Sequence, residues 1–208
     1  MENRMTENEI EVKFLVKDLS RLELRIQALG GKLVQPRVKE TNLRFDFPSG
    51  DLTRDHRVLR LRQDQTARLT YKDPAQVNHP VSVRREIEVE VSSFDDTRAL
   101  LEALGYQVFM LYEKYRTTYS FADTLVTLDE LPIGHFSEIE GPNAERLQEM
   151  AETLWLDWAL RSNESYAALF NRVKSTCGWT MDNLSFDDFL GKTVTPADLG
   201  LKFADRSA

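Results

Sequence analysis

Short runs in which charged and aliphatic residues alternate are the feature that most constrains how this chain can fold. The first run has the sequence EIEVKFLV at residues 9–16. Because successive side chains of a β-strand point to opposite faces, Glu9, Glu11 and Lys13 would share one face and the aliphatic residues the other. One such run is also explained by a half-buried antiparallel strand with its charges in water.

The alternation recurs along the chain, and the recurrence changes what it predicts. Like charges two residues apart on one strand face repel unless an ion or a partner strand lies between them. A polar face shared by at least six strands therefore predicts one large interior, such as the lumen of a closed barrel. The later charged rows are Arg60 and Arg62, Arg68 and Lys72, Arg84, Glu86, Glu88 and Glu90, Lys114 and Arg116, Asp129, and Glu138 and Glu140.

Composition narrows the class of protein. The chain has 208 residues, of which 41% are hydrophobic and 29% charged, as is ordinary for a single globular domain. Its net charge of −7 gives no overall basic footprint, so we expect no nucleic-acid partner. The single cysteine, Cys177, excludes an internal disulfide and a cysteine-based zinc site. The N-terminus lacks the apolar run of a signal peptide and no stretch is long enough to span a membrane, so we expect a cytoplasmic protein without membrane contact.

The order of predicted elements is mixed. Apolar spacing predicts helices at about 18–29, 93–104, 143–156 and 165–174, with Asp18 or Ser20 capping the first and Ser93, Asp95 or Asp96 the second. Residues 176–208 look less regular, but their apolar side chains predict an appendage that docks on the rest. Strands are predicted near 32–37, 40–47, 57–62, 68–72, 82–91, 112–120, 124–130 and 136–140.

These motifs, taken in order, resemble the CYTH superfamily, which contains class IV adenylyl cyclases, thiamine triphosphatases and inorganic triphosphatases. The ExExK signature of the family matches residues 9–13, and the similarity runs from about residue 7 to residue 170. The resemblance implies an α+β fold in which a closed tunnel of eight antiparallel strands carries helices on its outside. It also implies a tunnel domain at 1–175 and leaves 176–208 as an appendage of unknown role. The later matching motifs are LRLR at 59–62, LTYK at 69–72, REIE at 85–88, YEKYR at 112–116, LDE at 128–130, GHFSEIEG at 134–141 and SY at 165–166.

The resemblance also implies roles for individual residues. Those implied to bind phosphate oxygens are Lys13, Arg60, Arg62, Lys72, Lys114, Arg116 and, on the closing helix, Lys174. Those implied to hold Mg²⁺ or Mn²⁺ are Glu9, Glu11, Glu86, Glu88, Asp129, Glu138 and Glu140. Of all these, Glu138, Glu140 and Lys13 are implied to be catalytic. Elementary chemistry agrees, because arginine forks and lysines neutralise phosphate charge and hard carboxylate oxygens suit Mg²⁺.

The predicted activity is metal-dependent hydrolysis of a small-molecule triphosphate, by a monomer or a homodimer. Two alternatives stay open. A class IV adenylyl cyclase would use the same phosphate site with a ribose hydroxyl as nucleophile, although nothing in the sequence marks an adenine pocket. A non-catalytic module that binds polyphosphate or nucleotide is the third interpretation.

Lys13 offers a test of the predicted tunnel. If it lies among Arg60, Arg62 and Lys72, its replacement by methionine should relieve repulsion between cations. We then expect the empty protein to be at least as stable as before, while its affinity for triphosphate falls.

Overall fold

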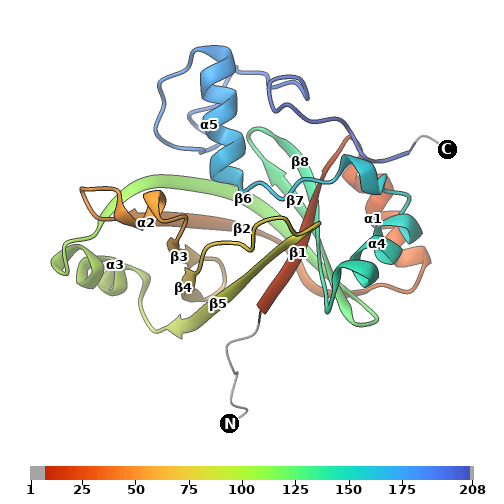
Figure 1. The fold of residues 1–208 in the computed structure, drawn as a ribbon, viewed down its shortest axis with the longest axis horizontal. Helices are drawn as coiled ribbons and strands as arrows, with labels where there is room; N and C mark the ends of the chain where they lie inside the picture. Colours follow the sequence, from red (N-terminus) through yellow and green to blue (C-terminus); the bar gives the residue numbers. More distant parts are fainter. Residues whose placement is uncertain (1–7, 207–208) are drawn as a thin grey trace, which may run out of the picture.

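The computed structural model describes residues 8–206 and folds them around one closed barrel of eight antiparallel strands (Figure 1). Neighbours in the barrel follow the order β1-β5-β4-β3-β2-β6-β7-β8, and β8 pairs with β1 to close the ring. This confirms the predicted α+β tunnel. The strands are β1 (Asn8–Val16), β2 (Lys32–Asp46), β3 (Val58–Gln63), β4 (Ala67–Lys72), β5 (Ser82–Val91), β6 (Gln107–Phe121), β7 (Thr124–Leu131) and β8 (Gly134–Glu140).

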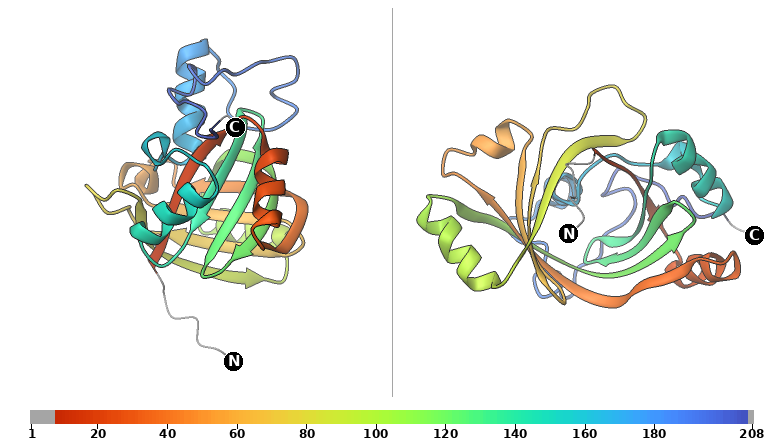
Figure 2. Two further views of the ribbon diagram at one scale, coloured as in Figure 1. Left: turned by 90° about the vertical axis from the view of Figure 1, so that its right-hand side faces the viewer. Right: turned by 90° about the horizontal axis from the view of Figure 1, so that it is seen from below.

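The helices lie outside the barrel wall or across its end (Figure 2). α1 (Leu19–Ala28) and α4 (Ala144–Thr153) cover the side formed by β1 and β8, and α3 (Phe94–Ala103) covers β3. α5 (Tyr166–Cys177) caps one end of the barrel, with its first turn at the tunnel wall and its axis directed away from the barrel. Two short elements complete the set, α2 (Asp51–Arg54) and the 3₁₀ turn η1 (Trp158–Leu160). No described helix is both long and apolar enough to cross a membrane.

Side-chain caps set where the longer helices begin. Asp18, rather than Ser20, caps α1 by accepting the backbone N–H of Arg21, and Ser93 caps α3 by accepting that of Asp96. These contacts satisfy N–H groups that the first helical turn leaves free. Gly30, at a φ of +90°, then reverses the chain after α1 without the strain that a side chain would add.

One expectation about the strands was wrong. The two strands predicted near 32–37 and 40–47 are a single strand, β2, which pairs along its length with β6. The register shifts between Leu33 and Gln35 and again between Gln35 and Val38. Pro36, which has no N–H to give to the ladder, falls within the second shift, so the bulge lets the strand continue past it.

The C-terminal segment docks on the barrel, as its apolar residues predicted. Leu184, Phe189 and Leu199 are buried in one cluster with α5, whereas Leu190 is 76% exposed and takes no part in the packing. Leu184 also pairs with β6 through its backbone: its N–H donates to the carbonyl oxygen of Leu111 at 2.9 Å. The segment therefore covers a stretch of β6 that β7 does not reach.

Candidate functional site

The barrel interior holds a cavity of about 640 Å³ whose wall is unusually rich in charge. All eight strands contribute to it, and its lining includes nine basic and eight acidic side chains. The predicted convergence on one cavity is confirmed for Glu9, Glu11, Lys13, Arg60, Arg62, Lys72, Glu138 and Glu140. The same cavity is also lined by Glu86, Glu88, Lys114 and Arg116.

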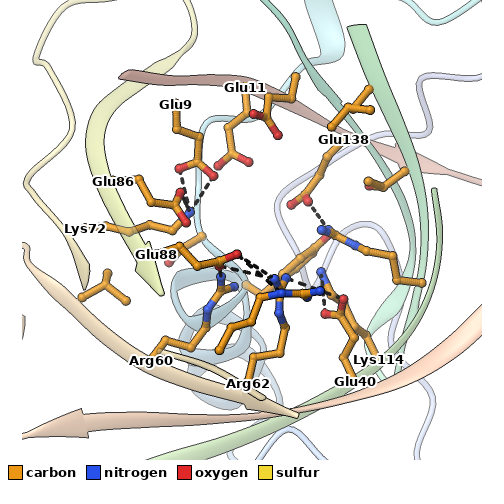
Figure 3. A pocket seen from close by; sticks show the side chains of 18 of the residues that line it. Glu9, Glu11, Glu40, Arg60, Arg62, Lys72, Glu86, Glu88, Lys114 and Glu138 are labelled. Atoms are coloured by element: carbon orange, nitrogen blue, oxygen red, sulfur yellow. Dashed lines mark hydrogen bonds and ion pairs between the residues drawn. The ribbon is translucent and has the colours of Figure 1, made fainter. Parts of the chain in front are cut away.

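One side of the cavity, which we call the basic half, gathers Arg60, Arg62, Lys114 and Arg116 from β3 and β6 (Figure 3). Buried acids hold these cations in place. Lys114 Nζ lies 3.0 Å from Asp129 Oδ2, and a nitrogen of Arg62 lies 3.3 Å from Glu88 Oε2. Arg116 contacts Asp129 as well, at 2.5 Å. The four cations are thus ordered before any ligand arrives, which lowers the entropy lost on binding.

Glu40 of β2 is the acid most enclosed by the basic half. Its carboxylate is 1% exposed and lies 3.7 Å from Arg62 and 3.5 Å from Lys114. Burial alone would raise the pKa of Glu40, but Lys114, Arg116 and Arg62 outweigh burial and lower this pKa to about 2. Glu40 is therefore ionised throughout the physiological range.

Lys13 of β1 lies between the two sides of the cavity, opposite Glu138 of β8. Its Nζ is 2.9 Å from Glu138 Oε1, donates to the carbonyl oxygen of Glu164 at 3.1 Å and sits 4.3 Å from the ring centre of Tyr166. Burial opposes the charge, yet Glu138 and Glu11 raise the pKa of Lys13 above its usual value. Lys13 is a fully charged, fixed group.

The other side, which we call the acidic half, contains Glu9, Glu11, Glu86 and Glu140 from β1, β5 and β8, together with Lys72 and Arg84. Figure 3 shows Glu9 and Glu86 turned toward Lys72. Lys72 Nζ lies 2.5 Å from Glu9 Oε1 and 2.7 Å from Glu86 Oε2. Arg84 of β5 pairs with both acids of β1: its nitrogens lie 3.1 Å from Glu9 and 3.3 Å from Glu11.

Glu140 differs from the other acids of the cavity wall. Within residues 8–206 it alone of the eight has no basic side chain within 4.0 Å. Burial and the charges of Glu9, Glu11 and Glu86 raise the pKa of Glu140 to about 7. The acidic half therefore has more negative charge than its own cations neutralise.

The acidic half offers the kind of ligand atoms that a divalent cation binds. The oxygens are all carboxylate, which suits Mg²⁺ or Mn²⁺. The carboxylates are not yet gathered, because among the described residues no three His, Cys, Asp or Glu side chains are close enough to surround an ion. Lys72 pairs with Glu9 and Glu86, and Arg84 pairs with Glu9, so a bound cation would take over part of the role that these two bases play.

Two of the sequence-predicted residues lie off the cavity wall. Asp129 is fully buried behind it, where it contacts Lys114 and Arg116 and accepts a hydrogen bond from the hydroxyl of Tyr166 at 2.8 Å. The Lys174 ammonium lies 4.8 Å from the ring centre of Phe170, beyond the residues that line the tunnel. The geometry favours Asp129 as a support for phosphate-binding cations and gives Lys174 no access to the cavity.

Several residues of the wall were not assigned a role from the sequence. Glu40 and Arg44 lie on the inner face of β2, and Tyr112 and Tyr166 reach the cavity from β6 and the start of α5. The alternation of polar and apolar residues in ETNLRF at 40–45 was a signal that could have found the first two. Arg84 was placed on a charged strand face but not in the site.

Comparison with known proteins places this fold and site in a family. The model of the CYTH domain matches residues 7–167, most of the chain. The chain belongs to the CYTH domain family. A Methanocaldococcus jannaschii protein described as a "putative adenylate cyclase" is 26% identical to this CYTH protein over 134 residues, which are 64% of this chain and 75% of that one.

Solved structures agree in fold. A "putative adenylate cyclase" from Vibrio parahaemolyticus superposes with a TM-score of 0.72 at 23% identity and covers 80% of this chain and 99% of its own. A Hippeastrum protein, described as a "putative adenylyl cyclase" with a dominant triphosphatase activity, gives a TM-score of 0.59 at 20% identity, covering 83% of this chain and 97% of that one. At these identities the two structures show that this CYTH protein shares their fold.

Proposed function

We propose that this CYTH protein is a metal-dependent phosphohydrolase that cleaves a triphosphate bound inside the barrel. The observation that carries the proposal is the division of one cavity inside the barrel into a basic half and an acidic half. A linear triphosphate needs several cations along its oxygens, and its metal ion needs carboxylates on another side. The interior offers both.

The chain's own residues would promote the reaction mainly by positioning the triphosphate and stabilising its charge. Arg62, Lys114 and Arg116 are already held by buried acids, so they can meet phosphate oxygens with little reorganisation. Lys13, fixed between Glu138 and Tyr166, can contact the same chain from the β1 side. Phosphoryl transfer relies mainly on this kind of positioning and charge stabilisation.

Glu9, Glu11, Glu86 and Glu140 would hold the divalent cation. When bound, the ion would neutralise phosphate charge and lower the pKa of a coordinated water. Glu140 supports this assignment because it has no cation of its own within the described chain. Glu88, Glu138 and Asp129 contact the phosphate-binding cations Arg62, Lys13 and Lys114, so we assign them to the ordering of those bases.

Hydrolysis is favoured over cyclisation by the lining of the cavity. Its described aromatic residues are Tyr112 and Tyr166, and the hydroxyls of both are bonded, to Arg60 and Asp129. Both are also largely buried, so neither offers the open ring on which an adenine could stack. The named triphosphatase activity of the Hippeastrum protein supports the same choice.

The decisive experiment measures phosphate release from tripolyphosphate, thiamine triphosphate and ATP with Mg²⁺ or Mn²⁺, and cyclic AMP alongside. We expect phosphate from at least one substrate and no cyclic AMP. Cyclic AMP as the main product would replace the proposal with a cyclase. Tight binding without turnover of any substrate would favour the non-catalytic module.

Paired variants test the site itself. Arg62→Gln should weaken tripolyphosphate binding by about 10- to 100-fold, the usual effect of losing a hydrogen bond between charged groups. Arg98→Gln is the matched control, because Arg98 lies on the exposed side of α3 and its one acidic partner within residues 8–206 is Glu102. An equal effect of the two variants would contradict binding in the tunnel.

A further inference from the structure

Arg44 stands out among the cations of the tunnel. Eight of the nine basic residues that line the cavity have an acidic partner within 4.0 Å. Across the described chain Arg44 has none, nor any hydrogen bond to another side chain or carbonyl. Burial and the neighbouring charges of Arg60 and Arg84 lower the pKa of Arg44 below its usual value. Its guanidinium, 5.5 Å from the ring centre of Phe109, is thus a positive charge that no acid among the described residues pairs with.

A second cation makes this arrangement less favourable still. Arg44 on β2 is the direct cross-strand partner of Arg60 on β3, and both line the cavity. Like charges directly opposite each other destabilise a strand pair. Arg60 is in part engaged already, since it donates to the hydroxyl of Tyr112 at 3.2 Å and lies 3.7 Å from Glu88. The wall at this point attracts negative charge that the chain itself does not supply.

Unsatisfied polar atoms are concentrated at the same place. Ten buried side-chain atoms in residues 8–206 have no hydrogen-bond partner, and six of them belong to neighbouring positions of β2 and β3. Buried polar groups are nearly always paired. The three arginine Nε atoms among the six are donors on side chains that line the cavity, so they call for an acceptor such as a ligand oxygen or ordered water, whereas Asn42 is outside the lining and Glu40 is itself an acid. The six atoms are Glu40 Oε2, Asn42 Nδ2, Asn42 Oδ1, Arg44 Nε, Arg60 Nε and Arg62 Nε.

The position of Arg44 along the tunnel limits which part of a ligand can reach it. Its partner on β6 is Met110, and Met110 is buried in one cluster with Tyr166 and Leu169 of α5. Arg44 therefore lies toward the end of the barrel that α5 covers. The organic group of a substituted triphosphate would need space beyond the phosphates, and α5 occupies the space at this end.

We propose that Arg44, with Arg60 and Tyr112, forms a pocket for the terminal phosphoryl group of the triphosphate at the end covered by α5. The organic substituent, where there is one, then points to the opposite end. The pocket deepens the proposed function, because it takes a triphosphate as the ligand of the same cavity. Arg44 and Glu140 have matching roles here: one is the cation and the other the acid whose charge only the ligand and its metal compensate.

Calorimetry with inorganic tripolyphosphate and with ATP, in the absence of divalent metal, tests the pocket on the full chain. Arg44→Gln should lower the affinity for both ligands by a similar factor of about 10 to 100, since both present the same terminal group. Its midpoint of unfolding in urea should be equal to or higher than that of the wild type. Arg98→Gln should change neither quantity.

Further outcomes decide between explanations. Arg44→Lys keeps the charge but loses the fork, so we expect a smaller loss of affinity, and this variant serves if Arg44→Gln fails to fold. Wild-type affinity in both Arg44 variants would overturn the pocket while leaving triphosphate hydrolysis by the wild type intact. A loss for tripolyphosphate without a loss for ATP would overturn the assignment to the terminal group. Absence of binding and turnover of tripolyphosphate, thiamine triphosphate and ATP by the wild type with Mg²⁺ or Mn²⁺ present would, by contrast, refute the proposed function itself.

Discussion

Lys13 and Glu138 lie opposite each other on β1 and β8, and their Nζ and Oε1 atoms form an ion pair of 2.9 Å inside the barrel. Arg116 contacts the second carboxylate oxygen of Glu138. The nearest charges to Lys13 are therefore acids, and the expectation that it sits among repelling cations no longer holds. Its removal breaks a buried pair.

Lys13→Met should destabilise the empty protein. Breaking a fully buried pair is strongly destabilising, but Arg116 remains to compensate Glu138, so we expect the free energy of unfolding to fall by about 1–3 kcal/mol. Urea unfolding with a metal chelator present measures this. A variant as stable as the wild type would show that the Lys13–Glu138 pair adds nothing to the empty fold.

Glu40 predicts a pH dependence of stability. Its pKa is about 2 in the folded protein, below that of an unfolded glutamate, so its contribution is fully present above about pH 5 and is lost as the pH falls toward 2. The difference in unfolding free energy between wild type and Glu40→Gln should shrink over this range by on the order of 3 kcal/mol. Urea unfolding at pH 7 and at pH 3 tests this. A difference that stays constant with pH would contradict the ionised, paired state of Glu40.

Glu140→Gln should have different effects on the stability of the empty protein and of the metal-bound protein. The change removes one of four carboxylates that repel one another, so at pH 8 and without metal we expect unfolding to require about 1–3 kcal/mol more. Mg²⁺ should then stabilise the variant less than it stabilises the wild type. Glu152→Gln on the exposed side of α4 is the control. Equal stabilisation of both proteins by Mg²⁺ would remove Glu140 from the metal site.

The C-terminal segment can be tested with two leucines of opposite burial. Leu184 is fully buried against α5 and β6, and Leu190 is mostly exposed. Leu184→Ala should lower the free energy of unfolding by about 2–5 kcal/mol, and Leu190→Ala should change it little. Both are measured by urea denaturation. A single transition, lowered as a whole in Leu184→Ala, would show that the segment and the barrel unfold together.

Much of the site could be predicted because charged and apolar residues alternate along the strands that form it. Residues two apart on a strand share a face whatever the rest of the fold does, so Glu9, Glu11 and Lys13 could be placed together from the sequence. Their partners could not. Lys13 meets Glu138 rather than Arg60 because of the register between β1 and β8, and register depends on how the whole barrel closes.

Other differences have local causes. Two strands were predicted at 32–37 and 40–47, but the bulge around Pro36 lets β2 continue against β6. Asp129 shares the inward face with Glu138, yet Tyr166 at the start of α5 covers it, and no strand pattern reveals the position of a helix that arrives from elsewhere. Lys174 is not among the residues that line the cavity, because only the start of α5 meets the tunnel and the helix rises away from it.

The strand pair that closes the barrel also sets the order in which the site can be assembled during synthesis. Glu11 pairs with Glu140, so the acids of β1 leave the ribosome long before β8 exists to meet them. Until then Glu9 and Glu11 stay in water, with no partner on the β8 side. Contacts so distant along the chain form late and slowly. The charged interior is thus a product of the final closure, and no partly made chain that ends before β8 can enclose a triphosphate.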